Sequence, residues 1–300
     1  MAAAGTKGIV GIVGLGIMGG AIARNLQAAG WQVIGHDVDP GRCGELGNAG
    51  IEIAANVEEI AARALVILTS LPHPDALQAT AEIVAASRGP KRIVVELSTF
   101  SLEDKGWAGQ ILSEAGHVLL DCPISGTGAQ AKTGDLVIYA SGDTASISAV
   151  KPLLLDFARE AHDLGAFGNG MKMKFVANLL VAIHNVATAE AFALGIKAGL
   201  DPKKILDLVK SGAGNSRVFE LRGPMMAEGR YSDATMKISV WQKDMAIIDD
   251  FARNLDCKTP LFDATVPIYE AAMAHGLGAQ DTAAVCVVLE EMAGIKRKHS

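Results

Sequence analysis

The chain has 300 residues, of which 50% are hydrophobic and 20% charged, and it contains 33 glycines. This composition excludes a disordered protein, and the length predicts two domains, each with its own core. The formal net charge of -6 argues against a surface for nucleic acid or anionic membranes, because such surfaces need clustered Lys and Arg.

The cysteines and the amino-terminal segment point to a reducing compartment. Four cysteines, spread from Cys43 to Cys286, are too few and too distant for a disulfide framework, a zinc site or a Cys-x-x-Cys pair. The first residues lack the basic region and the long apolar stretch of an export signal. We therefore expect a cytoplasmic protein without a metal site.

Short β-branched runs alternate with helix-like segments over the first half of the chain. This alternation predicts a parallel sheet covered by helices. Strands are predicted at residues 8–13, 33–37, 65–71, 93–97, 118–121 and 136–140. Helices are predicted at residues 21–29, 58–63, 102–114 and 145–155.

The character of the sequence changes after His162. Residues 165–170 are rich in glycine, and almost everything beyond them is helical, with helix starts signalled by Asp201-Pro202 and Thr259-Pro260. We therefore predict an α/β domain over residues 1–167 and an all-helical domain over residues 168–300.

A glycine motif follows the first predicted strand. Gly14, Gly16 and Gly19 form Gly-x-Gly-x-x-Gly directly before a helical segment. In this pattern the first glycine permits the tight turn, the second lets the backbone approach a pyrophosphate, and the third lets the helix pack on the strand. Free amides at the helix start hold the anion. The motif predicts a dinucleotide-binding Rossmann domain whose cradle comprises Gly14, Leu15, Gly16, Ile17, Met18 and Gly19.

Asp37 ends the next strand and bears on which dinucleotide binds. Its carboxylate would accept hydrogen bonds from the adenosine ribose, and its charge would repel a 2′-phosphate. The following residue, Val38, offers no charge to hold a phosphate, although Arg42 could reach the site. The sequence therefore favours NAD over NADP.

The string GLGIMGGAIARNL at residues 14–26 resembles the amino-terminal signature of the β-hydroxyacid dehydrogenases. That family contains 3-hydroxyisobutyrate dehydrogenase, tartronate semialdehyde reductase and, more distantly, 6-phosphogluconate dehydrogenase. Further matches occur in order along the chain, at Leu71-Pro72, at residues 96–99, 121–126 and 168–178, and at Lys243-Asp244.

The resemblance implies an α/β Rossmann domain followed by an all-α domain, joined by a long interdomain helix, with the active site between them. It also implies hydride exchange between a nicotinamide cofactor and a small 3-hydroxy acid or the corresponding semialdehyde, without a metal. The substrate would be a small anion.

Lys174 matches the catalytic lysine of the family. At about 100° per residue, Asn178 lies about 40° around the helix from Lys174 and about 240° from Lys172, which favours Lys174 as its partner. Burial would lower the pKa of a lysine, so that the neutral amine serves as a base for oxidation and the ammonium as an acid for reduction. Asn178 would orient the substrate hydroxyl or the lysine.

The substrate carboxylate needs hydrogen-bond donors. Ser125 and Gly126 resemble the anion-binding turn of the family, where the missing side chain allows close approach. Thr127 stands where the family usually has another glycine, so its methyl group narrows the predicted substrate site.

Further matches fall on the cofactor side. The resemblance places Ser98 and Thr99 near the nicotinamide and Leu71-Pro72 in the cofactor-binding loops. Lys243 matches a lysine that closes over cofactor and substrate.

The most apolar long stretch, residues 175–196, has the length of a membrane span. It carries Asn178 and Glu190, which are costly in lipid, so we expect a buried helix instead. A helix that is apolar on nearly all sides needs cover on all sides, which predicts a homodimer or homotetramer.

Three alternative functions stay open at this point. An imine reductase of the same fold would lack the catalytic lysine, which Lys174 supplies. A 6-phosphogluconate dehydrogenase-like enzyme would need a larger helical domain and basic residues for the phosphate. A non-catalytic dinucleotide-binding module would not need Lys174 and Asn178.

Overall fold

The computed structural model describes residues 7–297, in two compact units that divide between Lys174 and Phe175. The long helix α8 (Asn169–Lys197) starts in the first unit and ends in the second. The predicted domain boundary at residue 167 lies just before this helix, on the amino-terminal side of the division.

The first unit contains a parallel sheet of six strands in the order β3-β2-β1-β4-β5-β6. The order reverses between β1 and β4, and ligands of such sheets bind beside the carboxyl ends of the strands at this switch point. The strands are β1 (Ile9–Val13), β2 (Gln32–His36), β3 (Glu52–Ile53), β4 (Val66–Thr69), β5 (Ile93–Glu96) and β6 (Val118–Asp121).

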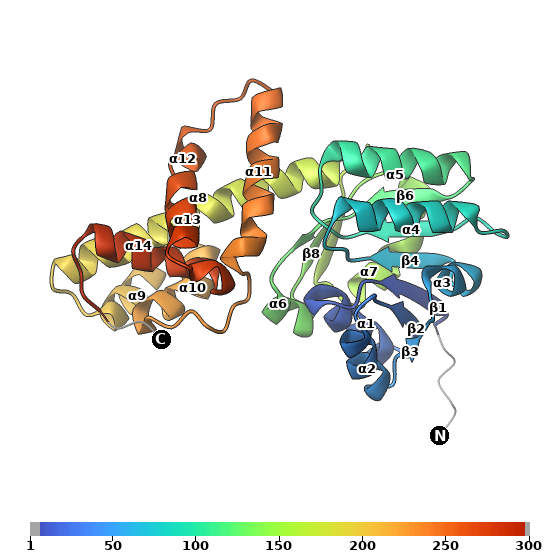
Figure 1. Cartoon of the computed structure of the whole chain (residues 1–300), viewed down its shortest axis with the longest axis horizontal. Helices are drawn as coiled ribbons and strands as arrows, with labels where there is room; N and C mark the ends of the chain where they lie inside the picture. The colour runs from blue at the N-terminus through green and yellow to red at the C-terminus, as the bar shows by residue number, and fades with distance from the viewer. Residues whose placement is uncertain (1–6, 298–300) are drawn as a thin grey trace. The chain divides into compact units, whose positions relative to one another are not determined.

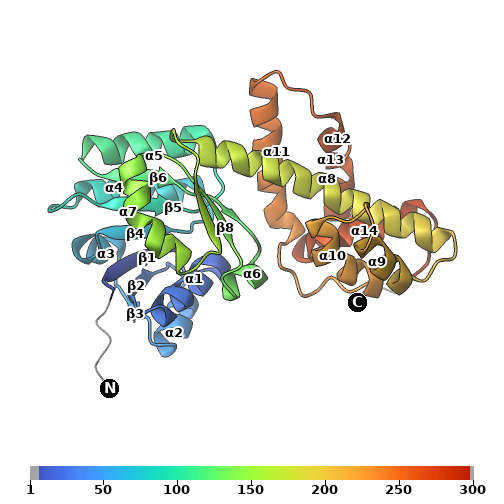
Figure 2. The same cartoon turned by 180° about the vertical axis from the view of Figure 1, so that it is seen from behind.

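Helices cover both faces of this sheet, as the near-continuous apolar strands require. On one face, α4 and α5 lie side by side, and residues of α3, α4 and α5 share one apolar core (Figure 1). On the other face, visible from behind in Figure 2, residues of α1 and α7 belong to a second core. The helices of this unit are α1 (Ile17–Ala28), α2 (Pro40–Asn48), α3 (Val57–Arg63), α4 (Pro74–Ala86), α5 (Leu102–Glu114), α6 (Gly128–Lys132) and α7 (Thr144–Leu155).

A second, smaller sheet follows β6 in the order β7-β8-β9. It comprises β7 (Ile124–Ser125), β8 (Val137–Ala140) and β9 (Glu160–Asp163), with β7 antiparallel and β9 parallel to β8. The strand predicted at residues 136–140 is β8, so it belongs to this mixed sheet and not to the parallel one. A bridge between Asp121 and Ser141 joins the end of β6 to the residue after β8.

The second unit is helical, as predicted. Asp201 caps α9, because its carboxylate accepts a hydrogen bond from the Lys203 amide at 2.9 Å. Beyond α8 the helices are α9 (Pro202–Lys210), α10 (Arg217–Glu228), α11 (Ile238–Asn254), α12 (Pro260–Asp263), α13 (Val266–Ala274) and α14 (Val285–Met292), with 3₁₀ turns at Leu277–Ala279 and Thr282–Ala284.

Helix α8 is the one helix within residues 7–297 that is long and apolar enough to cross a membrane, and 39% of its most apolar window is buried in the protein. Asn185 lies at the centre of this helix and is fully buried. Its amide donates at 2.8 Å both to the Tyr269 hydroxyl and to the Thr282 carbonyl. These two contacts satisfy the donor nitrogen of the Asn185 side chain inside the helical unit.

Candidate active site

The glycine turn after β1 has the geometry of a pyrophosphate cradle. Gly14 has a φ of +92°, and a Cβ there would lie 2.2 Å from the Ser70 carbonyl oxygen. A Cβ on Gly19 would lie 1.9 Å from the Gly14 carbonyl oxygen, so neither position accepts a side chain. Gly16 precedes α1 as its N-cap residue and has no side chain to cap it, which leaves the first amides of the helix, at Ile17 and beyond, available to an anion.

Asp37, the residue directly after β2, is hydrogen-bonded to this turn. Its Oδ2 accepts a hydrogen bond from the Leu15 amide at 2.7 Å, and its Oδ1 accepts one from the Asp39 amide at 2.9 Å. Arg42 Nη1 lies 3.3 Å from Oδ2. Burial raises the pKa of Asp37, but the two amides and the Arg42 guanidinium outweigh it and hold the pKa below its ordinary value. The carboxylate is therefore ionised at neutral pH.

The turn, the open helix start and this carboxylate together fit a nicotinamide dinucleotide.

The loops after β4 and β5 meet at the same edge of the sheet. Leu71 donates its amide to the Ser98 hydroxyl at 2.8 Å, and Ser98 donates its own amide to Glu96 Oε1 at 2.9 Å. Pro72 and Thr99 follow in these two loops. Leu71-Pro72, Ser98 and Thr99, which the resemblance assigns to the cofactor, therefore lie after the carboxyl ends of neighbouring strands.

Lys174 lies near the start of α8 and is 9% exposed. Its Nζ donates a hydrogen bond of 2.6 Å to the carbonyl oxygen of Ile124. Ile124 directly precedes Ser125 in β7, so the structure brings the lysine to the predicted anion-binding turn. Sequence reasoning named both the lysine and the turn but not the carbonyl that joins them.

The turn itself depends on a glycine. Gly126 has a φ of +142°, and a Cβ there would lie 2.5 Å from the Leu136 side chain. Thr127 follows it at the start of α6, where its amide donates to Gln130 Oε1 at 3.1 Å. The sharp turn at Gly126 leaves the Ser125 side chain partly exposed.

In the second unit, Asn178 contacts an acidic residue. Its Nδ2 donates to Asp244 Oδ2 at 3.1 Å, and both side chains are buried. Lys243 Nζ lies 3.5 Å from the other oxygen of Asp244. Asp244 is thus the shared partner of two predicted site residues, although sequence reasoning gave it no role.

The signal for Asp244 was present in the pattern of α11. Trp241, Asp244, Met245 and Ile248 are all buried and follow the spacing of the inward face of a helix. An acidic residue within such an apolar stripe needs a partner, and it is therefore a candidate for function.

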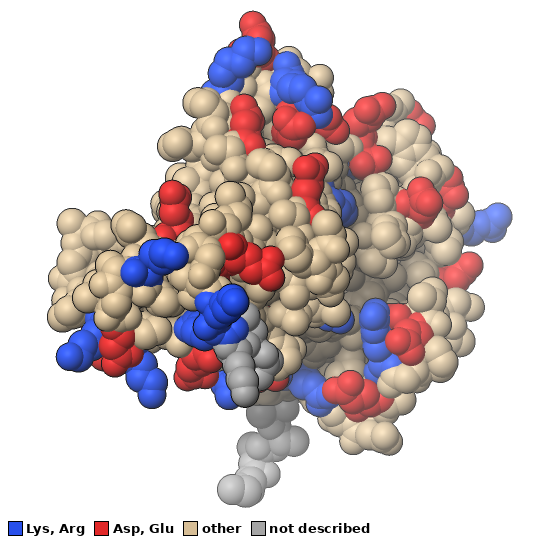
Figure 3. Space-filling model, turned by 60° about the vertical axis from the view of Figure 1, so that its left-hand side comes forward, with Lys and Arg blue, Asp and Glu red and all other residues tan. Residues whose placement is uncertain are grey.

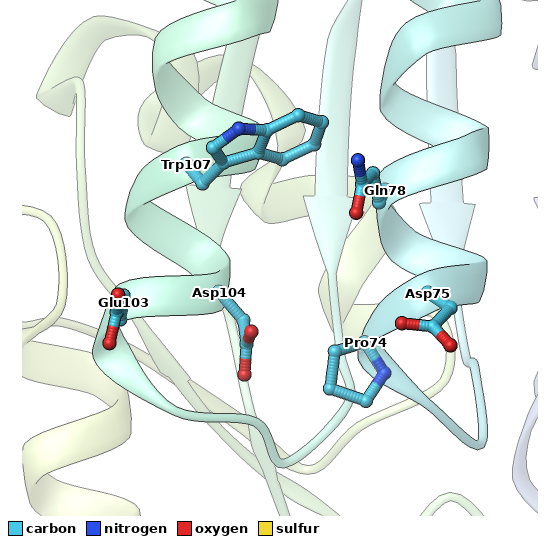
Figure 4. A pocket seen from close by; sticks show the side chains of 6 residues that line it. All are labelled: Pro74, Asp75, Gln78, Glu103, Asp104 and Trp107. Carbon is cyan, nitrogen blue, oxygen red and sulfur yellow. The ribbon is translucent and has the colours of Figure 1, made fainter.

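A separate pocket of about 230 Å³ lies between α4 and α5 (Figure 4). It contains none of the predicted site residues. Asp75, Glu103 and Asp104 line it, and their charge disfavours a dinucleotide or a small organic acid. The remaining lining residues are Pro74, Gln78 and Trp107.

Charges of both signs are interspersed on the face shown in Figure 3. Surface charges of the protein also form ion pairs, as in the contacts Arg63–Glu52 at 2.6 Å and Arg24–Glu45 at 2.8 Å. The mixture leaves this face without a broad field of one sign.

Comparison with known proteins places the chain in a family. Residues 9–198 match the family model described as the NAD binding domain of 6-phosphogluconate dehydrogenase. Residues 168–289 match the model described as NAD-binding of NADP-dependent 3-hydroxyisobutyrate dehydrogenase. The two matches together extend over both units.

Whole-length relatives agree with these matches. L-threonate dehydrogenase of Cupriavidus necator is 32% identical over 280 residues, which cover 92% of this chain and 94% of that protein. The crystal structure of 3-hydroxyisobutyrate dehydrogenase from Salmonella typhimurium superposes with a TM-score of 0.85 at 30% identity, covering 94% of this chain and all of that one.

The imine-reductase alternative fits less well. The imine reductase of Streptomyces aurantiacus covers 94% of this chain and 99% of its own, but with a TM-score of 0.63 at 20% identity, which shows a shared fold alone. The chain belongs to the β-hydroxyacid dehydrogenase family and is an NAD(P)-dependent oxidoreductase.

Proposed function

We propose that Lys174 is the general acid/base for hydride exchange between NAD and a small 3-hydroxy acid or its semialdehyde. One observation carries this proposal: the buried Lys174 Nζ is held 2.6 Å from the Ile124 carbonyl oxygen, directly beside the Ser125–Thr127 turn. A lysine fixed in this way has a defined position for proton transfer, in contrast to a solvated lysine on a helix surface.

The hydroxyl proton and the carboxylate of the substrate would then have separate partners in the protein. In oxidation the neutral Lys174 amine would take the hydroxyl proton, and in reduction the ammonium would return it. The Ser125 hydroxyl and the Gly126 amide would hold the substrate carboxylate, because the turn at Gly126 allows close approach. When bound, the nicotinamide supplies the hydride acceptor or donor.

Asp37 supports a preference for NAD. It is ionised, and an additional phosphate on the ribose would face its negative charge. Arg42 would favour NADP if it bound the additional phosphate, but its guanidinium is already paired with Asp37 at 3.3 Å and with Asp39 at 3.4 Å.

The decisive experiment compares Lys174→Ala with Lys172→Ala, which removes an exposed lysine from the same helix turn. Turnover would be followed by cofactor absorbance with L-threonate, 3-hydroxyisobutyrate and a panel of related acids and semialdehydes, each with NAD and NADP. Lys174→Ala should lower kcat by about a hundredfold or more, while Lys172→Ala should stay near the wild type. Equal turnover of the two variants would refute the assignment of Lys174.

We also propose that the protein is a homodimer or homotetramer that packs through α8. Val176, Leu180 and Leu194 are 52%, 45% and 73% exposed on this helix, which is a large apolar exposure for one element. A second copy of the chain would cover them. Sedimentation that detects only monomer at micromolar concentration would contradict this.

We also propose that the protein is cytoplasmic. All four cysteines, Cys43, Cys122, Cys257 and Cys286, are free thiols, which suits a reducing compartment. Fractionation of cells that express the tagged chain would test it.

A further inference from the structure

A buried ion cluster lies beneath the candidate site in the first unit. Lys105 of α5 places its Nζ 2.6 Å from Glu96 Oε2 and 2.8 Å from Asp121 Oδ1. All three side chains are fully buried. Glu96 ends β5 and Asp121 ends β6, so one lysine joins the carboxyl ends of two neighbouring strands.

The Asp121 side of the cluster holds the start of helix α8. Asp121 Oδ2 accepts a hydrogen bond from the Met171 amide at 2.8 Å and one from the Ser141 hydroxyl at 3.0 Å. The Ser141 hydroxyl in turn accepts a hydrogen bond from the Gly170 amide at 2.9 Å. Two amides in the first turn of the helix that carries Lys174 are therefore fixed by this carboxylate and its hydroxyl neighbour.

Gly170 shows how closely the helix approaches the cluster. A Cβ at this position would lie 2.3 Å from the Tyr139 carbonyl oxygen and 3.0 Å from Asp121 Oδ2. The absence of a side chain is what lets the helix start reach the carboxylate.

The Glu96 side of the cluster holds the loops assigned to the cofactor. Glu96 Oε1 accepts a hydrogen bond from the Ser98 amide at 2.9 Å, and the Ser98 hydroxyl accepts one from the Leu71 amide at 2.8 Å. A displacement of Glu96 would thus be passed to both loops.

The charges show why Lys105 binds both carboxylates at once. Burial favours the neutral amine, but the fields of Glu96 and Asp121 outweigh it and raise the pKa of Lys105, so the lysine stays charged. Two carboxylates and one ammonium leave a net negative charge. The amino-terminal end of α8, which carries the positive end of the helix dipole, faces that charge.

We propose that Glu96, Lys105 and Asp121 are positioning residues for the reaction. Asp121 sets the start of α8 and hence the place of Lys174, Glu96 sets the Ser98 and Leu71 loops at the cofactor edge, and Lys105 keeps the two carboxylates in fixed relation. This inference rests on the proposed function, since it concerns the same site.

The test uses Asp121→Asn and Glu96→Gln, which keep the shape of each side chain. Lys105 retains one carboxylate in either variant, so the buried charges balance and both variants should fold. The matched control is Asp201→Asn, which changes a carboxylate that accepts the Lys203 amide at 2.9 Å and caps α9 in the second unit. Each protein is examined by amide hydrogen exchange, by NADH titration and by steady-state kinetics.

The two variants should differ in which step they affect. Asp121→Asn should speed exchange at Gly170 and Met171 and lower kcat by about tenfold, because a charged acceptor becomes neutral, while NADH affinity stays near the wild type. Glu96→Gln should speed exchange at Leu71 and Ser98 and weaken NADH binding by about tenfold, with a smaller effect on kcat at saturating cofactor. Asp201→Asn should change neither property.

Two results would overturn the inference. One is wild-type exchange and kinetics in both variants, and the other is an equal loss of every property in both, which would mark the cluster as a stability element only. If the wild-type protein turns over no acid in the panel, the proposed function fails by itself. The exchange and NADH measurements then still decide whether the cluster positions these two segments.

Discussion

Lys174 Nζ and the carbonyl oxygen of Ile124 are 2.6 Å apart, and this contact links the helix with the candidate base to the turn with the candidate anion site. Ile124 and Ser125 form β7, which pairs with β8 in the small mixed sheet. That sheet therefore places the candidate anion-binding turn at the lysine. The contact makes the turn as important to the proposed chemistry as the lysine itself.

The first prediction concerns Gly126→Ala. The substitution puts a side chain where φ is +142° and where a Cβ would lie 2.5 Å from the Leu136 side chain. The turn must shift, so KM for the acid should rise by about tenfold while NADH affinity stays unchanged.

Gly116→Ala provides the matched control for this glycine. Gly116 also has a positive φ, of +79°, but a Cβ there has nothing within 4 Å. Gly116→Ala should lose about 1 kcal/mol of unfolding free energy, measured by urea denaturation, and Gly126→Ala should lose more because its Cβ also overlaps Leu136. Gly126→Ala alone should change KM. A similar KM in the two variants would argue against the turn as the carboxylate site.

Local patterns predicted the parts of the fold that depend on short stretches of sequence. The cradle of Gly14, Gly16 and Gly19 and the apolar strands beside it could be predicted because each signal lies within a few residues. The helix predicted at residues 21–29 begins earlier, at Ile17, because the last motif glycine, Gly19, already lies in the first turn of α1.

Helix α2 was missed because its sequence is PGRCGELGN, and three glycines oppose helix formation. Pro40 at its first position and the Asp39 cap start it nevertheless. The two-residue strands β3 and β7 carry too few residues for an alternating pattern.

The contacts that could not be predicted join residues distant in the chain. Lys105, Glu96 and Asp121 each look ordinary in sequence, since Lys105 lies in a helix of mixed polarity and the two acids follow apolar strands. Only the parallel pairing of β5 with β6 brings the acids side by side, with Glu96 paired to Asp121. No spacing rule contains that information.

The second prediction concerns Asp244→Asn. Asp244 accepts a hydrogen bond from Asn178 Nδ2 at 3.1 Å and thereby fixes which way the Asn178 amide faces. An asparagine partner can donate as well as accept, so that orientation is lost and kcat should fall by about tenfold.

The control for Asp244 is Asp249→Asn on the same helix, whose carboxylate forms an exposed ion pair with Arg253. Loss of this surface pair should change stability by about 0.5 kcal/mol or less and leave kcat unchanged. Steady-state kinetics of the two purified variants would check both expectations. Equal kcat values would remove Asp244 from the site.

The third prediction concerns cofactor choice. Asp37→Ser removes the charge that would repel a 2′-phosphate and releases Arg42, which lies 3.3 Å from the carboxylate. The ratio of kcat/KM for NAD to that for NADP should fall by about tenfold or more. In the double variant Asp37→Ser/Arg42→Ala most of the gain for NADP should vanish, because the guanidinium is gone. A gain that persists in the double variant would show that Arg42 does not bind the phosphate.

The last prediction concerns the acid stability of the helical unit. Asp281 Oδ1 lies 3.4 Å from Arg222 Nε, and its Oδ2 accepts the Thr235 amide at 2.8 Å. Burial raises the pKa of Asp281, but Arg222 and the amides of Ala283 and Met236 outweigh it, so the folded pKa lies below the ordinary value. A lowered folded pKa contributes stability that is fully present above the unfolded pKa of about 3.9 and is lost as the pH falls toward the folded pKa.

Asp281→Asn should therefore lower the unfolding free energy by about 3 kcal/mol at pH 7, because Arg222 is left buried without its partner. Urea denaturation of both proteins from about pH 7 to about pH 3 would check this: the difference between them should hold above about pH 5 and shrink below about pH 4. A difference that stays constant over that range would mean that the ionisation of Asp281 does not contribute to stability.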